Sequence, residues 1–238
     1  MKEIIRKIVS FLISSVRYNL KIIFANRFGY FLLASVIIFL LITVINLFSE
    51  ESDPSPALAY YWLMVPGLLL MFYPSVFGIQ NDVDSRMLEL LFGIPNYRYK
   101  VWLVRLVVMY IVVFALLVVL AVLTAFALTP FYVIGMVYQL MFPIFFLGCV
   151  SFMLSTLIRN GYGTAVVMVI IGLFFWIMSG ALSQSKWNIF LNPFRSPGGL
   201  SDVVWATVIA NNRLYLIIGT FISVLYGLYN LQKREKFI

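Results

Sequence analysis

Long apolar stretches without charge alternate with short charged clusters along this chain. Five of these stretches contain no Asp, Glu, Lys or Arg and are 22, 28, 53, 26 and 19 residues long. A helix that crosses a bilayer needs roughly 20 predominantly apolar residues. The pattern therefore predicts an all-α integral membrane protein. The five stretches are 28–49, 54–81, 106–158, 160–185 and 214–232.

The 53-residue stretch is too long for one helix, and Thr129-Pro130 supplies a break within it. Proline lacks the N–H that a helix interior uses, and the residue before it disfavours helical geometry. We therefore expect six transmembrane helices that form one membrane domain over residues 28–238. The predicted spans lie near 28–48, 58–80, 102–127, 131–157, 162–182 and 213–231.

Composition narrows the classes of function. Only 11% of the residues are charged, against about 25% in an ordinary soluble domain. The absence of His excludes His-based triads and His metal ligands, and the single Cys excludes a disulfide within the chain. We expect no catalytic residue, metal site or cofactor site in this chain.

Basic residues are divided unevenly between the two sides that six spans define. Fourteen lie in segments 1–27 and 81–105, at Arg159 and after residue 232, and only three lie in the loops of the other side. Basic residues accumulate on the cytoplasmic side of membrane proteins. Both termini are therefore predicted to be cytoplasmic, in the inner membrane of a bacterial cell. The net charge of +8 reflects this topology and predicts no nucleic-acid partner.

The first 27 residues predict an amphipathic helix that lies on the cytoplasmic membrane surface. Lys7, Arg17 and Lys21 share one polar stripe with two serines, and aliphatic residues follow the opposite face. Such a helix lies in the plane of the lipid headgroups. The polar stripe either anchors the chain to membrane lipid or also contacts a cytoplasmic partner, and the sequence does not separate these roles.

The cytoplasmic segment 81–105 predicts a short helix between the second and third spans. Asp82 or Asp84 can cap its start, while Gly93 and Pro95 end it. A plain connection would need only a few residues. A short rigid helix at this place indicates a mechanical contact with a partner.

This segment resembles the cytoplasmic motif of the membrane subunits of ABC-2 type ABC exporters. That motif reads roughly Gly-Thr-Leu-Glu-x-Leu-x-x-x-Pro and is followed by a Lys. Here Leu88, Glu89, Leu91 and Pro95 match, and Arg105 stands at the Lys position. The chain departs from the family pattern where the motif has Gly, Thr and a second Gly. These departures are Arg86, Met87 and Val104.

The resemblance implies a permease that moves its substrate by alternating access. The short helix would dock on a separate ATPase subunit that holds ATP and magnesium, and a second permease copy or a related permease would complete a homo- or heterodimer. The other interpretation of Glu89 and Arg86 is a solvated ion pair one helical turn apart. The residues assigned to ATPase coupling are Arg86, Leu88, Glu89, Leu91, Gly93, Pro95, Arg98 and Arg105.

The chain contains no Gly-x-x-x-x-Gly-Lys-Ser/Thr sequence and so predicts no ATPase activity of its own. No charged residue falls in the middle of a predicted span, which argues against an ion-coupled carrier. The alternatives are a non-transporting scaffold subunit and, less favoured, a secondary carrier. The substrate is unidentified, and the apolar spans favour a hydrophobic or amphipathic one. Aromatic candidates for an apolar path are Phe72, Tyr73, Phe174, Phe175 and Trp176.

The outer segment before the sixth span predicts a short helix from Val203 to Ala210, re-entrant or interfacial. It would either close a translocation path from outside or cap the interface without a gating role. In the sixth span, Gly219, Ser223 and Gly227 recur every four residues and form a small-residue face for helix packing. The partner of this face, within the chain or across a dimer, is left open.

Overall fold

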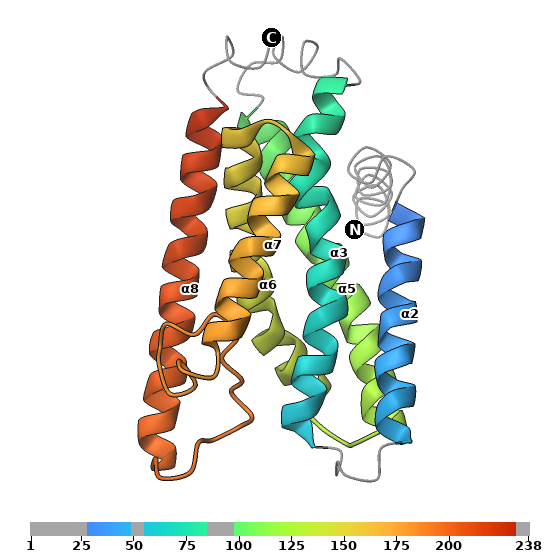
Figure 1. Ribbon diagram of the computed structural model, residues 1–238, viewed down its shortest axis with the longest axis vertical. Helices are drawn as coiled ribbons and strands as arrows, with labels where there is room; N and C mark the ends of the chain where they lie inside the picture. The colour runs from blue at the N-terminus through green and yellow to red at the C-terminus, as the bar shows by residue number, and fades with distance from the viewer. Residues whose placement is uncertain (1–27, 49–54, 85–97, 232–238) are drawn as a thin grey trace, which may run out of the picture.

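The computed structural model describes residues 28–48, 55–84 and 98–231, and this part of the chain is helical without β-strands. Six α-helices form one bundle (Figure 1). A six-residue π-helix, η1, precedes α5. The elements are α2 (Phe28–Leu47), α3 (Pro56–Asp84), η1 (Arg98–Leu103), α5 (Val104–Ala127), α6 (Val133–Ile158), α7 (Gly161–Met178) and α8 (Asp202–Asn230).

Successive helices run in opposite directions along the long axis of the bundle (Figure 1). We call the end where α3 finishes and α5 begins the Asp84 end, and the end where α8 begins the Asp202 end. The start of α2 and the finish of α8 both lie toward the Asp84 end. The bounds agree closely with five of the predicted spans and extend the sixth.

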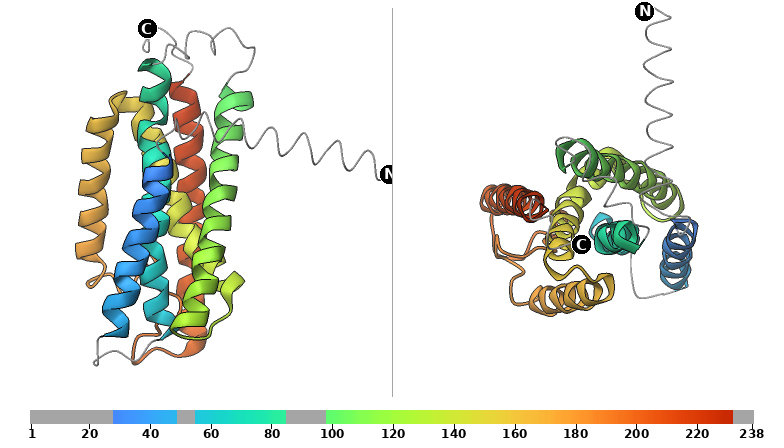
Figure 2. Two further views of the ribbon diagram at one scale, coloured as in Figure 1. Left: turned by 90° about the vertical axis from the view of Figure 1, so that its right-hand side faces the viewer. Right: turned by 90° about the horizontal axis from the view of Figure 1, so that it is seen from above.

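Helices α3 and α6 form the centre of the bundle (Figure 2). Each packs on the other and on α5 and α7, while α2 packs on α3 and α8 packs on α6. Close approach between the two central helices depends on Gly148, because a Cβ atom there would lie 2.3 Å from Met71 Cε. Of the spans compared, α3 is the most buried and α7 the least.

Two connections between successive helices fall at the turn residues that the sequence indicates. The connection between α5 and α6 contains Thr129 and Pro130, as predicted. Between α6 and α7, Arg159 adopts a left-handed conformation with φ 58°. Asn160 then caps α7, because its side-chain oxygen accepts a hydrogen bond from the Gly163 N–H at 3.0 Å.

The outer helix before the sixth span differs from the prediction. Residues 203–210 are helical, but they belong to one continuous helix, α8, that begins at Asp202 and runs through the sixth span. Neither Asn211 nor Asn212 interrupts it. Asparagine lowers helix propensity only modestly, and no Pro or Gly stands there. A separate re-entrant or interfacial helix is therefore absent from the described residues.

The chain is a multi-pass helical membrane protein by the length and composition of its helices. Helices α3, α5, α6, α7 and α8 are each long and apolar enough to cross a bilayer. Helix α2, with 20 residues, packs beside α3 and is also apolar, but it is not among these five helices. Large apolar side chains cover much of the outer surface of the bundle, as expected of helices that face lipid.

Candidate functional site

The segment predicted to contact an ATPase starts after α3 and finishes at η1, at the Asp84 end. Of its predicted coupling residues, only Arg105 is fully described; it is the second residue of α5. Arg98 is the first residue of η1. The interfacial-helix residues Lys7, Arg17 and Lys21 lie outside the described part of the chain. The same holds for the remaining coupling residues, which are Arg86, Leu88, Glu89, Leu91, Gly93 and Pro95.

A buried ion pair joins the two helices on either side of this segment. The Arg105 guanidinium donates a hydrogen bond to the Asp82 carboxylate, and the two residues are 7% and 4% exposed. The indole ring of Trp102 lies 4.9 Å from the guanidinium. Asp82 therefore belongs to α3. The sequence had indicated Asp82 as a possible cap for the start of the next helix, and that prediction is wrong. The pair holds the end of α3 against the start of α5.

Two amide side chains tie further helices together at the Asp84 end. Gln80 on α3 accepts a hydrogen bond from the backbone N–H of Gly161, the first residue of α7. Asn230 on α8 donates to the carbonyl of Thr156 on α6 at 2.6 Å. Together with the ion pair, these contacts hold α3, α5, α6, α7 and α8 to one another at the Asp84 end.

At the Asp202 end, a non-helical segment enters the bundle. Residues 188–192, which we call the buried loop, are at most 5% exposed. Non-helical backbone at the depth of membrane helices is tolerated where protein buries it. Asn192 donates to the carbonyl of Ala57 on α3 at 2.7 Å. The buried loop thus fills the space between α3 and α8.

Asn212 on α8 holds this loop from the other side. Its amide nitrogen lies 2.8 Å from the carbonyl oxygens of both Lys186 and Asn188 and donates to both. Since an asparagine amide carries two N–H groups, both donors are used within the connection between α7 and α8.

Arg213 lies beside Asn212, inside α8, and is only 6% exposed. Its Nε donates to Gln139 Oε1 at 2.9 Å, and its Nη2 donates to the carbonyl of Leu191 at 3.4 Å. Its Nη1 donates to the side chain of Asn212. All three acceptors are neutral, and within the described residues no carboxylate pairs with this cation. Arg213, the first residue of the predicted sixth span, is the twelfth residue of α8 because that helix begins at Asp202.

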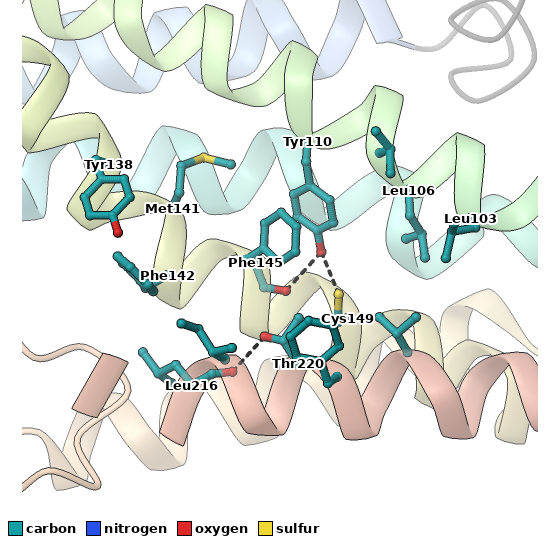
Figure 3. A pocket seen from close by; sticks show the side chains of 14 residues that line it. Leu103, Leu106, Tyr110, Tyr138, Met141, Phe142, Phe145, Cys149, Leu216 and Thr220 are labelled. Carbon is teal, nitrogen blue, oxygen red and sulfur yellow. Dashed lines mark hydrogen bonds between the residues drawn. The ribbon is translucent and has the colours of Figure 1, made fainter. Parts of the chain in front are cut away.

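Two apolar grooves lie on different sides of the central helices. The α5–α8 groove, of about 480 Å³, lies between α5 and α8 with α6 as its floor (Figure 3). The α2–α7 groove, of about 520 Å³, lies between α2 and α7 over α3 and α6. Phe72 and Trp176, two of the aromatic candidates for an apolar path, line the second groove.

Cys149 lies on the floor of the α5–α8 groove and serves packing. Its sulfur is 3.0 Å from the hydroxyl of Tyr110, and that hydroxyl donates to the carbonyl of Phe145 at 2.9 Å (Figure 3). In the described part of the chain, no group of His, Cys, Asp and Glu is placed to hold a metal ion.

The small-residue face of the sixth span packs on α6 of the same chain. A Cβ atom on Gly219 or Gly227 would lie 2.6 Å from the ring of Phe146 or Phe152, respectively. Ser223 between them is buried and bonds to its own helix through the Gly219 carbonyl. This face is therefore used inside the bundle.

The sequence did not identify the polar residues that hold the buried loop. Asn188 and Asn192 look like ordinary turn residues, and Gln139 lies in an otherwise apolar helix. A polar or charged residue inside an apolar helix is costly unless it has a partner. Gln139 and Arg213 are such residues, so the sequence could have indicated that each needs a partner. Their pairing with each other depends on the packing of α6 against α8.

Comparisons of this chain with models of known protein families, with curated proteins and with solved structures found no match.

Proposed function

We propose that this chain is the membrane-spanning permease subunit of an ATP-driven ABC-2 type exporter. The observation that carries the proposal is the Leu-Glu-x-Leu-x-x-x-Pro sequence from Leu88 to Pro95. It falls between α3 and η1, where a coupling segment would reach a cytoplasmic ATPase. ATP binding and hydrolysis belong to that partner, and this chain supplies the path through the membrane.

The Asp82–Arg105 ion pair supports this proposal through its position. Both ends of the coupling segment are attached to one rigid contact between α3 and α5. A push on the segment by the ATPase would therefore move both helices together. Since α3 is the most buried span, its movement would reach the centre of the bundle.

We assign the Asp84 end to the cytoplasm and the Asp202 end to the outer face of the inner membrane. The basic segments of the chain connect to the Asp84 end, which accords with the positive-inside rule. Helix α2 then serves as the first of six spans. In this orientation, the buried loop closes the outer end, and its release would accompany the outward-open state.

A second permease copy would pack along the α2–α7 groove. Helix α7 is the least buried span, and the groove beside it is apolar throughout most of its lining. Transmembrane helices associate through close packing of such surfaces. A hydrophobic or amphipathic substrate fits a path formed between two such faces.

A secondary carrier is the weaker candidate. Among the described residues, Arg213 is the buried charge at the Asp202 end, and an arginine side chain does not release its proton in proteins. Asp82 is occupied by Arg105. Neither arrangement provides the free carboxylate that proton coupling uses.

The test is co-purification of the tagged chain from its own host, with mass spectrometry of the partner and measurement of ATP hydrolysis. Glu89→Arg reverses the charge at the center of the coupling motif and should abolish both ATPase association and transport. Glu51→Arg, in the acidic connection between α2 and α3, is the matched control and should leave both unchanged. Membrane levels of the two variants must match that of the unaltered chain.

A Glu89→Arg variant that keeps its ATPase partner and its transport would refute the coupling assignment. Absence of any P-loop ATPase from the purified complex, together with tolerance of Glu89→Arg, would instead identify a scaffold subunit. Flux that follows an ion gradient without ATP would identify a secondary carrier.

A further inference from the structure

A small cavity lies beside the buried ion pair at the Asp84 end, where α3, α5 and α6 meet. Its volume is about 20 Å³. Trp102 of η1 and Arg105 of α5 line it together with Ser75 and Gly78 of α3, and apolar residues complete its walls. Every lining residue except Gly78 is buried. The cavity therefore lies inside the bundle, unlike the two surface grooves.

Gly78 leaves open space on the α3 side of this cavity. Outside its own stretch of helix, a Cβ atom at Gly78 would meet no heavy atom nearer than Trp102 Cζ3, at 4.0 Å. That separation is an ordinary van der Waals contact. At Gly148, by contrast, the helices are in close contact, and a Cβ atom would lie 2.3 Å from Met71 Cε. The space beside Gly78 is thus not filled by protein atoms.

The indole N–H of Trp102 is a buried donor without an acceptor. Trp102 is 4% exposed, and among the described residues its Nε1 has no hydrogen-bond partner. An indole offers one donor and no acceptor, so only an acceptor atom beside the ring can satisfy it. Buried polar atoms are nearly always bonded to protein or to ordered water. The unpartnered Nε1 therefore favours water at the cavity that Trp102 lines.

Two other polar side chains of the lining have bonding capacity left. The Ser75 hydroxyl lies 4.0 Å from Met109 Sδ, and a thioether is only a weak acceptor. The Arg105 guanidinium carries five N–H donors, of which one bonds to Asp82 within the described part of the chain. A water molecule can accept from Trp102 and Arg105 and donate one of its own hydrogens to the Ser75 oxygen.

We propose that this cavity binds a structural water molecule, held by the Trp102 indole N–H, the Ser75 hydroxyl and the Arg105 guanidinium. A site holds water when it offers at least roughly 10–15 Å³ and two to four polar partners, and this cavity meets both conditions. The water extends the polar contact of Arg105 from Asp82 into the space among three helices. The assignment rests on the cavity and its side chains alone and holds whether or not the chain couples to an ATPase.

The test uses the full chain in detergent micelles, with tryptophan labelled at its indole nitrogen for NMR. Trp102→Phe identifies the indole N–H signal of Trp102 among those of the five tryptophans. A rotating-frame Overhauser measurement detects contact between this proton and water, and the sign of the cross-peak separates contact from hydrogen exchange. We expect a water contact cross-peak at the Trp102 indole of the unaltered chain.

Gly78→Ala is the variant that should displace the water. Its methyl group enters the cavity without a close contact, so the cross-peak should disappear and the indole signal should shift. Gly172→Ala is the matched control, because it adds the same methyl group on α7, where no heavy atom lies within 4 Å. It should leave the cross-peak unchanged. Ser75→Ala removes one partner of the water and should weaken the cross-peak, which keeps the test valid if Gly78→Ala does not fold.

Several results would overturn the proposal. These are the absence of a water contact cross-peak in the unaltered chain, an undiminished cross-peak in Gly78→Ala or Ser75→Ala, or an equal loss in Gly172→Ala. A cross-peak from the Trp102 indole to detergent acyl protons in place of water would assign the space to hydrocarbon.

Discussion

Asp82 and Arg105 are the individual residues whose environment departs most from a simple apolar span. Each is almost fully buried, and each neutralises the other at the Asp84 end. Removal of one partner of a buried pair leaves an uncompensated charge, whereas replacement of both by apolar residues is often neutral. The value of the pair therefore lies in fixing where α3 meets α5, rather than in net stability.

We predict that Asp82→Leu lowers the free energy of unfolding by about 3–5 kcal/mol, because Arg105 is left buried and unpaired. The double replacement Asp82→Leu with Arg105→Leu should recover most of this loss. Unfolding in mixed micelles of neutral detergent and dodecyl sulfate measures both. If the double variant is as unstable as the single one, packing rather than charge accounts for the loss.

The buried loop and α8 depend on each other at the scale of elements. Within the loop, a single turn bond joins the Leu191 N–H to the Asn188 carbonyl at 3.2 Å, and side chains satisfy other backbone groups of the connection. Asn212 satisfies two carbonyls of the connection between α7 and α8, and Asn192 reaches α3. The loop is therefore held by a few specific side-chain bonds, each of which a mutation can remove.

We predict that Asn212→Ala releases the loop, because loss of a buried hydrogen-bond partner costs about 1–3 kcal/mol. Ile189→Cys, placed in a Cys149→Ser background, reports the release as faster reaction with a membrane-impermeant maleimide, by about tenfold or more. Asn211→Ala is the matched control, since Asn211 is the exposed neighbour. Equal labelling rates in the two variants would show that Asn212 does not hold the loop.

At the scale of the whole molecule, the bundle presents two apolar faces, one beside α7 and one between α5 and α8. Helix α7 contributes little to the interior, and Gly172 on it has no heavy atom within 4 Å of a Cβ position. The α2–α7 groove beside it is the face that we assign to a second permease copy. The opposite side, between α5 and α8, carries the second apolar groove.

This division predicts which positions cross-link between copies of the chain. In a Cys149→Ser background, Leu173→Cys on α7 should form a cross-linked dimer in membranes with a short bifunctional maleimide. Val119→Cys on α5, equally exposed at 57% against 56%, should remain monomeric. Cross-linking at position 119 but not at position 173 would move the dimer contact to the other face.

The sequence by itself determined the helical spans, because length and the absence of charge are local properties that a bilayer reads directly. The break at Thr129-Pro130 followed from local geometry in the same way. Only the tertiary structure decided which side chains meet. Asp82 pairs with Arg105 because α3 packs on α5, and Arg213 donates a hydrogen bond to Gln139 because α8 packs on α6. The continuity of α8 through Asn212 was also decided there, since packing on α6 and the bonds to the buried loop offset a mediocre local helix propensity.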